Sequence, residues 1–361
     1  MNLLSQPVAI QGIGCVGGFG QGGDAFIRAL QQETDRPQIL DQCHGDGQAY
    51  YPAFFAKTDG LDEFVAKRSL RRLDHYSRLA LLGGCMALAD AGIDADKREK
   101  VGVIVASGYG AAATTFGFLD SVLEDGDHCA SPTAFSNSVH NVAGAYLSMQ
   151  LGIHGPNLTL SQFDMSVTAA LHNAVCWLQQ GRVDTVLVGG VDEHCAVLNY
   201  CYGRYFADEP VPERIEPFAF DKQTAIPGEG AAFLVLSRDP KKARYGYIDA
   251  LCGGHVESGG DALIQRSPVL LGADGQRHSA CWYRQSIGTP KTSCSHVYGS
   301  LPCGQAFDLV AAALMVRDQQ CHALSSREEE CAPIRQVTSI KCGADGQFGA
   351  VRVTRGFGKG R

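Results

Sequence analysis

The sequence predicts a layered α/β fold, because strand-like and helix-like segments alternate along it and the strand-like segments are apolar throughout. Of the 361 residues, 45% are hydrophobic, 19% are charged and 43 are glycine. This composition is typical of a globular protein with a buried sheet and many tight turns. Strands that are apolar on both faces occur where helices cover both sides of a sheet. We therefore expect helices on both faces of the sheet.

The first two thirds of the chain supply most of the predicted elements. Residues 6–14 read as a strand that ends in glycines, and residues 23–32 as a helix with an apolar side. A long helix is predicted over residues 69–93, with Ser69 as its N-cap and Gly92 as its stop. Buried strands are further predicted over 101–108, 184–192 and 230–238, and a helix over 166–183 that is closed by Gly181.

A weaker copy of this pattern begins at about residue 246. It contains strand-like runs, a helix over 304–318 and two occurrences of the pentapeptide Gly-Ala-Asp-Gly-Gln, at 272 and 343. Both copies follow apolar runs, so they are candidates for comparable loops. With residues 237–246 as the joint, we expect an N-terminal half over 1–245 and a shortened, diverged C-terminal half over 246–361.

Charge and cysteine usage exclude several classes of function. The formal net charge is -7, and basic residues gather only near residue 242 and at the C-terminal end, which argues against nucleic acid binding. The 14 cysteines are scattered in apolar runs without the spacing of a metal site, so we expect no metal. They are typical of buried residues in a reducing compartment.

The sequence shows no sign of a membrane-spanning segment, a secretion signal or a nucleotide-cofactor site. No apolar run reaches the roughly 18 residues that cross a bilayer, and the N-terminal residues lack a basic stretch, so the protein is predicted to be cytoplasmic. Gly12, Gly14 and Gly17 match a dinucleotide-binding spacing, but no helix follows promptly and no acidic residue is placed for a ribose. We therefore expect no cofactor.

Four stretches together resemble the β-ketoacyl synthases of fatty acid and polyketide synthesis. They are "VAIQGIGCVGGFG", "LDHYSRLALLGGCMALADAGI", "FSNSVHNVAGAYLSMQLGIHGPNLTL" and "EPFAFDKQTAIPGEGAAFLVL". Their order and spacing match the family from residue 7 to about 237. The resemblance implies the thiolase fold, with α-β-α-β-α layers built from two pseudo-repeated halves.

The catalytic positions of that family are altered in this chain. Condensing members carry a Cys at the bend between a strand and a helix, and two His on later loops. The overlay places Asp164 at the Cys position, Leu271 near the first His, Ser300 at the second His and Ser295 at a Lys that precedes it. Ala344 stands for a Phe of the gate loop. We therefore expect no catalytic residue in the usual places.

Asp164 also has a structural interpretation, since an acidic residue before a helix accepts backbone N–H bonds and meets the positive end of the helix dipole. Capping or tunnel lining is the favoured role. His140 is a candidate base, but it falls in a segment that the family places at its dimer interface. Cys176 is expected in the core, and Cys303 on a loop where nothing lowers its pKa.

These substitutions favour a catalytically degenerate subunit of the chain-length-factor type. Such a subunit pairs with an active ketoacyl synthase and receives acyl carrier protein through the complex, in a type II polyketide or aryl polyene system. The predicted tunnel and interface residues are Phe116, Phe118, Asn137, Val139, His140 and Phe163. The alternatives are a decarboxylase or condensing enzyme with relocated residues, and a homodimeric acyl-binding scaffold.

Overall fold

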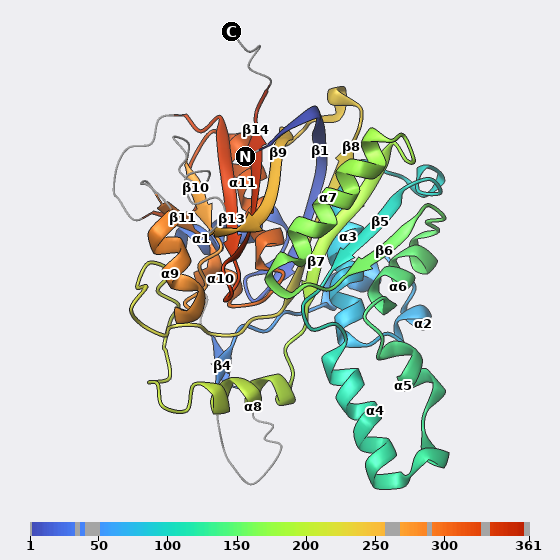
Figure 1. Cartoon of the computed structure of the whole chain (residues 1–361). Helices are drawn as coiled ribbons and strands as arrows, with labels where there is room; N and C mark the ends of the chain where they lie inside the picture. The colour runs from blue at the N-terminus through green and yellow to red at the C-terminus, as the bar shows by residue number, and fades with distance from the viewer. Residues whose placement is uncertain are drawn as a thin grey trace.

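Twelve strands form one mixed sheet through the molecule (Figure 1). The computed structural model describes residues 2–32, 37–39, 51–256, 268–286, 291–325 and 333–356. The strands of the sheet are β1 (Leu3–Gly17), β2 (Gly20–Gln21), β5 (Gly102–Ala106), β6 (Asn157–Leu160), β7 (Thr185–Asp192), β8 (Gly230–Ser237), β9 (Tyr247–His255), β10 (Val269–Leu271), β11 (Lys291–Ser293), β12 (Leu324–Ser325), β13 (Gln336–Cys342) and β14 (Gln347–Thr354).

The sheet consists of two runs of strands with the same pattern. One run has the order β1-β8-β7-β5-β6, and the other has the order β9-β14-β13-β10-β11. In each run the first two pairings are antiparallel and the next two are parallel. Antiparallel pairing of β1 with β9 joins the runs. The proposed boundary at residue 246 falls between β8 and β9, and the division into two domains stays a prediction.

Helices complete a stack of five layers. α7 (Ser166–Gln179) and α11 (Gly304–Asp318) contact strands of both runs, and their apolar side chains share one core cluster with both. α3 (His75–Asp90) and α6 (Val142–Leu151) cover the other face of the first run. Tyr283 on α9 (Arg277–Ser286) packs on the other face of the second run. The α-β-α-β-α arrangement predicted from the resemblance is confirmed.

The single helix predicted over residues 69–93 is wrong, because α2 (Lys67–Leu70) and α3 are separate helices. Ser69 lies inside α2, and Asp74 is the N-cap of α3, where its carboxylate accepts a hydrogen bond from the Ser77 amide at 2.8 Å. The guanidinium of Arg78 donates to the carbonyl oxygen of Leu70, the last residue of α2, and to that of Leu73, which lies between the two helices. These polar contacts satisfy the backbone at the break, so two short helices replace one long helix.

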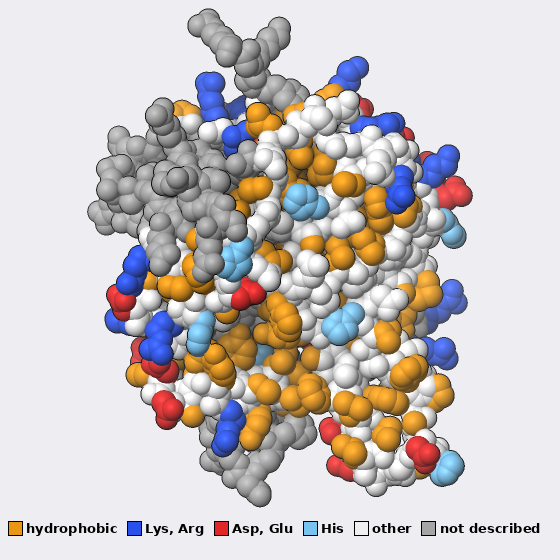
Figure 2. All heavy atoms as spheres, in the orientation of Figure 1, with side chains coloured by type: hydrophobic (Ala, Val, Ile, Leu, Met, Phe, Trp, Pro, Cys, Tyr) orange, Lys and Arg blue, Asp and Glu red, His pale blue; other side chains and the backbone are white. Residues whose placement is uncertain are grey.

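A helical hairpin extends from the body of the molecule (Figure 1). It is formed by α4 (Ala112–Asp125) and α5 (Pro132–Asn137), and Figure 2 shows hydrophobic side chains across its surface. In the part of the chain that is described, no helix has the length and apolar character needed to span a bilayer. The remaining elements are α1 (Gly23–Gln32), α8 (Ala196–Tyr205), α10 (Ser295–Tyr298), a pair of short strands β3 (Gln38–Ile39) and β4 (Pro52–Ala53), and five 3-10 turns.

Candidate functional site

The bend that carries Asp164 connects the edge strand β6 to α7. A 3-10 turn over Phe163–Met165 forms the bend, and Phe163 has a φ of 45°, which few residues other than glycine adopt. The Ser166 hydroxyl lies 2.7 Å from the Phe163 carbonyl oxygen and accepts a hydrogen bond from the Gln162 amide at 2.8 Å. Met165 is the N-cap position of α7, and no side chain caps it. The prediction that Asp164 caps the helix is therefore wrong.

Asp164 instead forms an ion pair with a buried lysine. The Lys341 Nζ lies 3.2 Å from the Asp164 Oδ1 and 3.0 Å from the Asp274 Oδ2, and it donates to the Gly272 carbonyl oxygen at 3.3 Å. The side chains of Lys341 and Asp274 are each 3% exposed, and that of Asp164 is 29% exposed. One ammonium thus connects three segments: the bend, the loop after β10, and β13.

The electrostatics of this cluster keep Lys341 charged. Burial alone lowers the pKa of Lys341, but the carboxylates of Asp274 and Asp164 outweigh burial and raise that pKa well above its usual value. Burial also raises the pKa of Asp164, and the Lys341 ammonium opposes the shift. A protonated amine is not a nucleophile, so Lys341 in this ion pair does not attack an acyl group.

The other altered positions lie around the same cluster, with one exception. The Ser300 hydroxyl donates to the Asp274 Oδ2 at 3.0 Å and accepts from the Gln276 side chain at 2.8 Å. The buried Ser295 hydroxyl donates to the Ala273 carbonyl oxygen at 2.6 Å. Leu271 is the exception, because its side chain packs in an apolar part of the core. From the loop after β10, it is Asp274 that contacts Lys341.

Sequence reasoning missed both Asp274 and Lys341, although a signal for them was present. Asp274 is the acidic residue in the first copy of the repeated pentapeptide, and Lys341 stands two residues before the second copy. The two copies form different loops, since the first leads into α9 and the second is the turn between β13 and β14. The repeat therefore marked two segments that meet at the candidate site.

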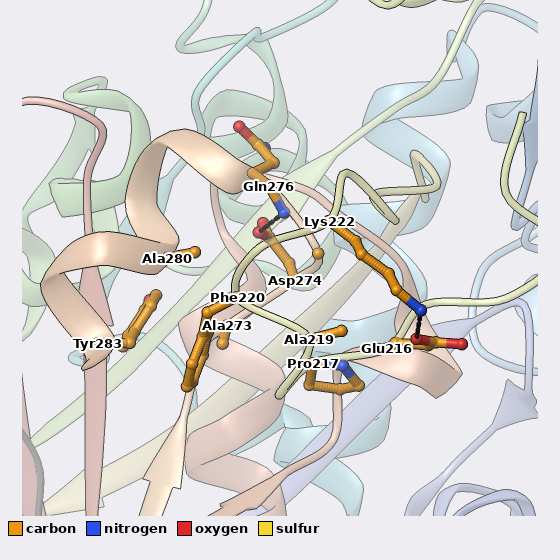
Figure 3. A pocket seen from close by; sticks show the side chains of 11 residues that line it. Glu216, Pro217, Ala219, Phe220, Lys222, Ala273, Asp274, Gln276, Ala280 and Tyr283 are labelled. Atoms are coloured by element: carbon orange, nitrogen blue, oxygen red, sulfur yellow. Dashed lines mark hydrogen bonds and ion pairs between the residues drawn. The ribbon is translucent and has the colours of Figure 1, made fainter. Parts of the chain in front are cut away.

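A narrow crevice lies beside Asp274 (Figure 3). Asp274 and Gln276 lie on one side of it, and the segment 216–222 and Tyr283 on the others, with Lys222 paired to Glu216 at 3.6 Å. The Tyr283 hydroxyl accepts a hydrogen bond from the Cys342 amide at 2.8 Å. The residues that line the crevice include no cysteine and no histidine, so they bring neither a thiol nor an imidazole to Lys341 and its two carboxylates.

Two tyrosines lie near the cluster. Burial raises the pKa of Tyr202 to about 12, against a hydrogen bond with Ser300 that lowers it, and the charge of Asp274 raises it further. Burial also raises the pKa of Tyr109, whose ring meets that of Phe163 edge-on with centroids 6.2 Å apart. Both hydroxyls stay protonated at neutral pH. They can donate hydrogen bonds, but they are not bases.

Of the two cysteines considered as nucleophiles, Cys303 lies on a loop as predicted, in the turn before α11, and Cys176 does not lie in the core. Cys303 is fully buried, and burial raises the pKa of its thiol well above the usual value. Its amide donates to the Asp192 carboxylate at 2.9 Å. Cys176, expected in the core, is exposed on α7. A buried thiol with a raised pKa is inert, so Cys303 is not a nucleophile.

The predicted interface residues lie on and around the α4–α5 hairpin. Asn137 is buried, where it donates to the Arg72 carbonyl oxygen and accepts from the Tyr146 hydroxyl, each at 3.0 Å. Val139 and His140 are exposed in the segment that follows α5. Phe118 contacts Phe135 across the hairpin with ring centroids 5.6 Å apart, and Phe116 is partly exposed on α4. Their roles at an interface stay predictions.

Comparisons with known proteins agree with this architecture. Residues 5–242 match the family model described as the β-ketoacyl synthase N-terminal domain. The chain is 26% identical over 287 residues to 3-oxoacyl-[acyl-carrier-protein] synthase 2 of Vibrio cholerae, across 76% of this chain and 68% of that protein.

Two solved structures share the fold at low identity. One is described as the ishigamide ketosynthase/chain length factor; it has a TM-score of 0.77 and 17% identity, and covers 97% of this chain and 100% of that one. The other is a type II polyketide acyl-carrier protein in complex with its ketosynthase bound to the hexaketide, with a TM-score of 0.71, 15% identity, and coverage of 97% and 99%.

Proposed function

The chain is a member of the β-ketoacyl synthase family, and we propose that it is the non-catalytic partner of an active β-ketoacyl-ACP synthase in type II polyketide or fatty acid synthesis. In this role it completes the dimer of the active subunit and shapes the acyl tunnel, in the manner of a chain length factor. Acyl carrier protein reaches the complex through the active subunit. The proposed complex works in the cytoplasm without a cofactor.

One observation supports the proposal: Asp164, which the resemblance aligns with the nucleophile of condensing members, is held in an ion pair with Lys341. An acyl group on Asp164 is a mixed anhydride, which lies above a thioester in free energy and is a poor store for an acyl chain. Condensation also requires donors that stabilise an enolate. Asp274 binds the same Lys341 ammonium as Asp164 and is buried close to it. Its negative charge repels an enolate.

The surface around β6 supports an obligate partner. β6 is an edge strand that pairs only with β5 among the described strands, so one row of its backbone groups is open to pairing. Large apolar side chains are exposed nearby on α6 and on the hairpin: Phe116, Leu119, Leu123, Phe135, Val139 and Met149. Obligate interfaces are largely apolar and usually bury more than about 2,000 Å². The partner that suits this surface is a second ketosynthase-type subunit, whose own edge strand can pair with β6.

Co-expression with candidate active synthases, followed by native mass measurement, tests this proposal. We expect a stable complex that contains one or more copies of each chain. Met149→Glu places a charge on α6, where Met149 is 64% exposed, and is expected to abolish the complex. Leu3→Glu is the matched control, because Leu3 is 72% exposed at the start of β1, far from β6 in the strand order.

Two results contradict the proposal. One is a chain that stays a homodimer beside every active synthase tested, which favours an acyl-binding scaffold. The other is condensing or decarboxylating activity in the purified chain, which favours an enzyme with relocated catalytic residues.

A further inference from the structure

We propose that Lys341 is a positioning residue for product length: through Asp164 it holds the bend so that Phe163 is presented to the partner subunit as a wall of the acyl tunnel. This inference rests on the proposed function and deepens it, because it assigns the control of chain length to an ion pair on the C-terminal half. The proposal stands on the geometry of the bend, the exposure of Phe163 and the position of the bend after the edge strand.

The first step concerns the conformation of Phe163. Its φ of 45° is unfavourable for a residue with a Cβ, and such a conformation persists only where surrounding contacts fix it. Two contacts are local: the Ser166 hydroxyl meets the Phe163 carbonyl oxygen, and the Met165 amide donates to the Gln162 carbonyl oxygen at 3.0 Å. The third is the ion pair of Asp164, the next residue, with Lys341.

The second step concerns the anchor. Lys341 lies on β13 and is held from the other side by Asp274 and by the Gly272 carbonyl oxygen. An ammonium that is 3% exposed keeps its ionic partners, because an unpaired buried charge is costly. Asp164 is therefore tied to a rigid sheet, and the backbone of the bend is fixed with it.

The third step concerns the direction in which Phe163 points. Its side chain is 62% exposed, an unusual state for a phenylalanine beside a core helix, and its ring meets the Tyr109 ring in an edge-on arrangement. Residues 161 and 162, which connect it to the edge strand β6, are exposed as well. When a partner pairs along β6, the Phe163 ring enters the interface. An exposed aromatic ring held in one place is suited to close the end of an apolar tunnel.

A double-mutant cycle on product length tests the proposal. The variants are Phe163→Ala, Asp164→Ala and the combination of both, each assembled with the active synthase. Asp164→Ala frees the bend and leaves Lys341 paired with Asp274. We expect each single variant to lengthen the products by at least one two-carbon extension. In the Phe163→Ala background, Asp164→Ala should add no further change.

Lys341→Met is the second variant, and Arg352→Met is the matched control. Arg352 forms a partly buried ion pair with Asp249 at 2.8 Å between β14 and β9. Lys341→Met should reproduce the product shift of Asp164→Ala, whereas Arg352→Met should leave product length unchanged. If lost stability were the only effect, Lys341→Met and Arg352→Met would behave alike. It would not give Lys341→Met the same shift in product length as Asp164→Ala.

The outcomes separate this proposal from the proposed function. If Phe163→Ala lengthens the products while Asp164→Ala and Lys341→Met do not, the positioning role of Lys341 is wrong and the tunnel role of Phe163 stands. Additive shifts in the double variant also overturn it. If no complex with a synthase forms in the wild type, the proposed function itself has failed.

Discussion

The Lys341 ammonium lies 3.2 Å from the Asp164 carboxylate, so a residue from the last part of the chain closes the bend that precedes α7. The two residues come from different halves of the predicted pseudo-repeat. Their contact is a link between the halves.

The purified chain should form no acyl adduct. The described bend carries no thiol, and the carboxylate in its place is paired with an ammonium. Incubation with acyl carrier protein bearing an acyl thioester, followed by intact mass measurement, should give only the unmodified mass. An adduct that maps to Asp164 or to any cysteine contradicts this prediction.

Asp164→Ala and Lys341→Met should differ in their effect on stability. Asp164→Ala leaves Lys341 with Asp274 and should lower the free energy of unfolding by roughly 1 kcal/mol, because the Asp164 side chain is partly solvated. Lys341→Met leaves the buried carboxylate of Asp274, and the partly exposed one of Asp164, without their cation and should cost about 3–5 kcal/mol. Chemical denaturation of both variants measures the difference.

The same Asp164→Ala variant should keep the turnover of a reconstituted complex within a few fold of wild type. Its expected defect lies in stability and product length, since the proposed function gives Asp164 no chemical step. A drop in turnover of several orders of magnitude, with the complex still assembled, assigns Asp164 a chemical role instead.

Phe116→Ala and Phe118→Ala test whether the hairpin extends the tunnel wall beyond Phe163. Phe116 is partly exposed on α4, and Phe118 packs against Phe135 of α5. Removing either ring opens space at the hairpin, so longer products are expected from the pair. Mass analysis of extracted products measures the change. The tunnel role is wrong if these variants and Phe163→Ala all assemble normally and leave the product distribution unchanged.

Glu193 should make the protein less stable at neutral pH than near pH 4. Its side chain is buried after β7 and accepts a hydrogen bond from the Ala113 amide at 2.8 Å, and burial raises its pKa to about 7. The folded pKa thus lies above the unfolded value of about 4.3. The free energy of unfolding should therefore fall as the pH rises from about 4 through 7, and stay lowered above it.

Glu193→Gln keeps an acceptor for the Ala113 amide and removes the titration. The variant should match wild type near pH 4 and exceed it by on the order of 3 kcal/mol at pH 8. Urea unfolding at several pH values gives the comparison. A difference between variant and wild type that does not change with pH contradicts the predicted titration of Glu193.

The alternation of strands and helices could be predicted from local patterns, whereas the five layers followed from the resemblance. α1 and α11 have the predicted bounds, and each begins at a glycine; α1 has one apolar side, and α11 is a long run of apolar residues. The break between α2 and α3 was missed because the Asp74 cap and the Arg78 hydrogen bonds depend on how the chain folds back. No local pattern distinguishes that arrangement from one continuous helix.

The candidate site was only partly predictable. Asp164 lies in the part of the chain whose order and spacing match the family, whereas Ser295 and Ser300 lie beyond it and were aligned with less support. Lys341 could not be located from the sequence, since it lies on β13, where polar and apolar residues are mixed and no pattern marks it, and it meets Asp164 only after the two halves pack together. A buried ion pair between distant segments depends on the tertiary structure. In the sequence, only the repeated pentapeptide indicated the two segments that form it.

The most direct test of the central claim is the turnover and product length of an active partner synthase, measured with and without this chain. Because the chain is proposed to complete the dimer and its tunnel, the partner alone should lose at least tenfold in turnover and lose its defined product length. Adding the wild-type chain should restore both, with every acyl adduct on the partner. Equal turnover and identical products in the two samples contradict the account.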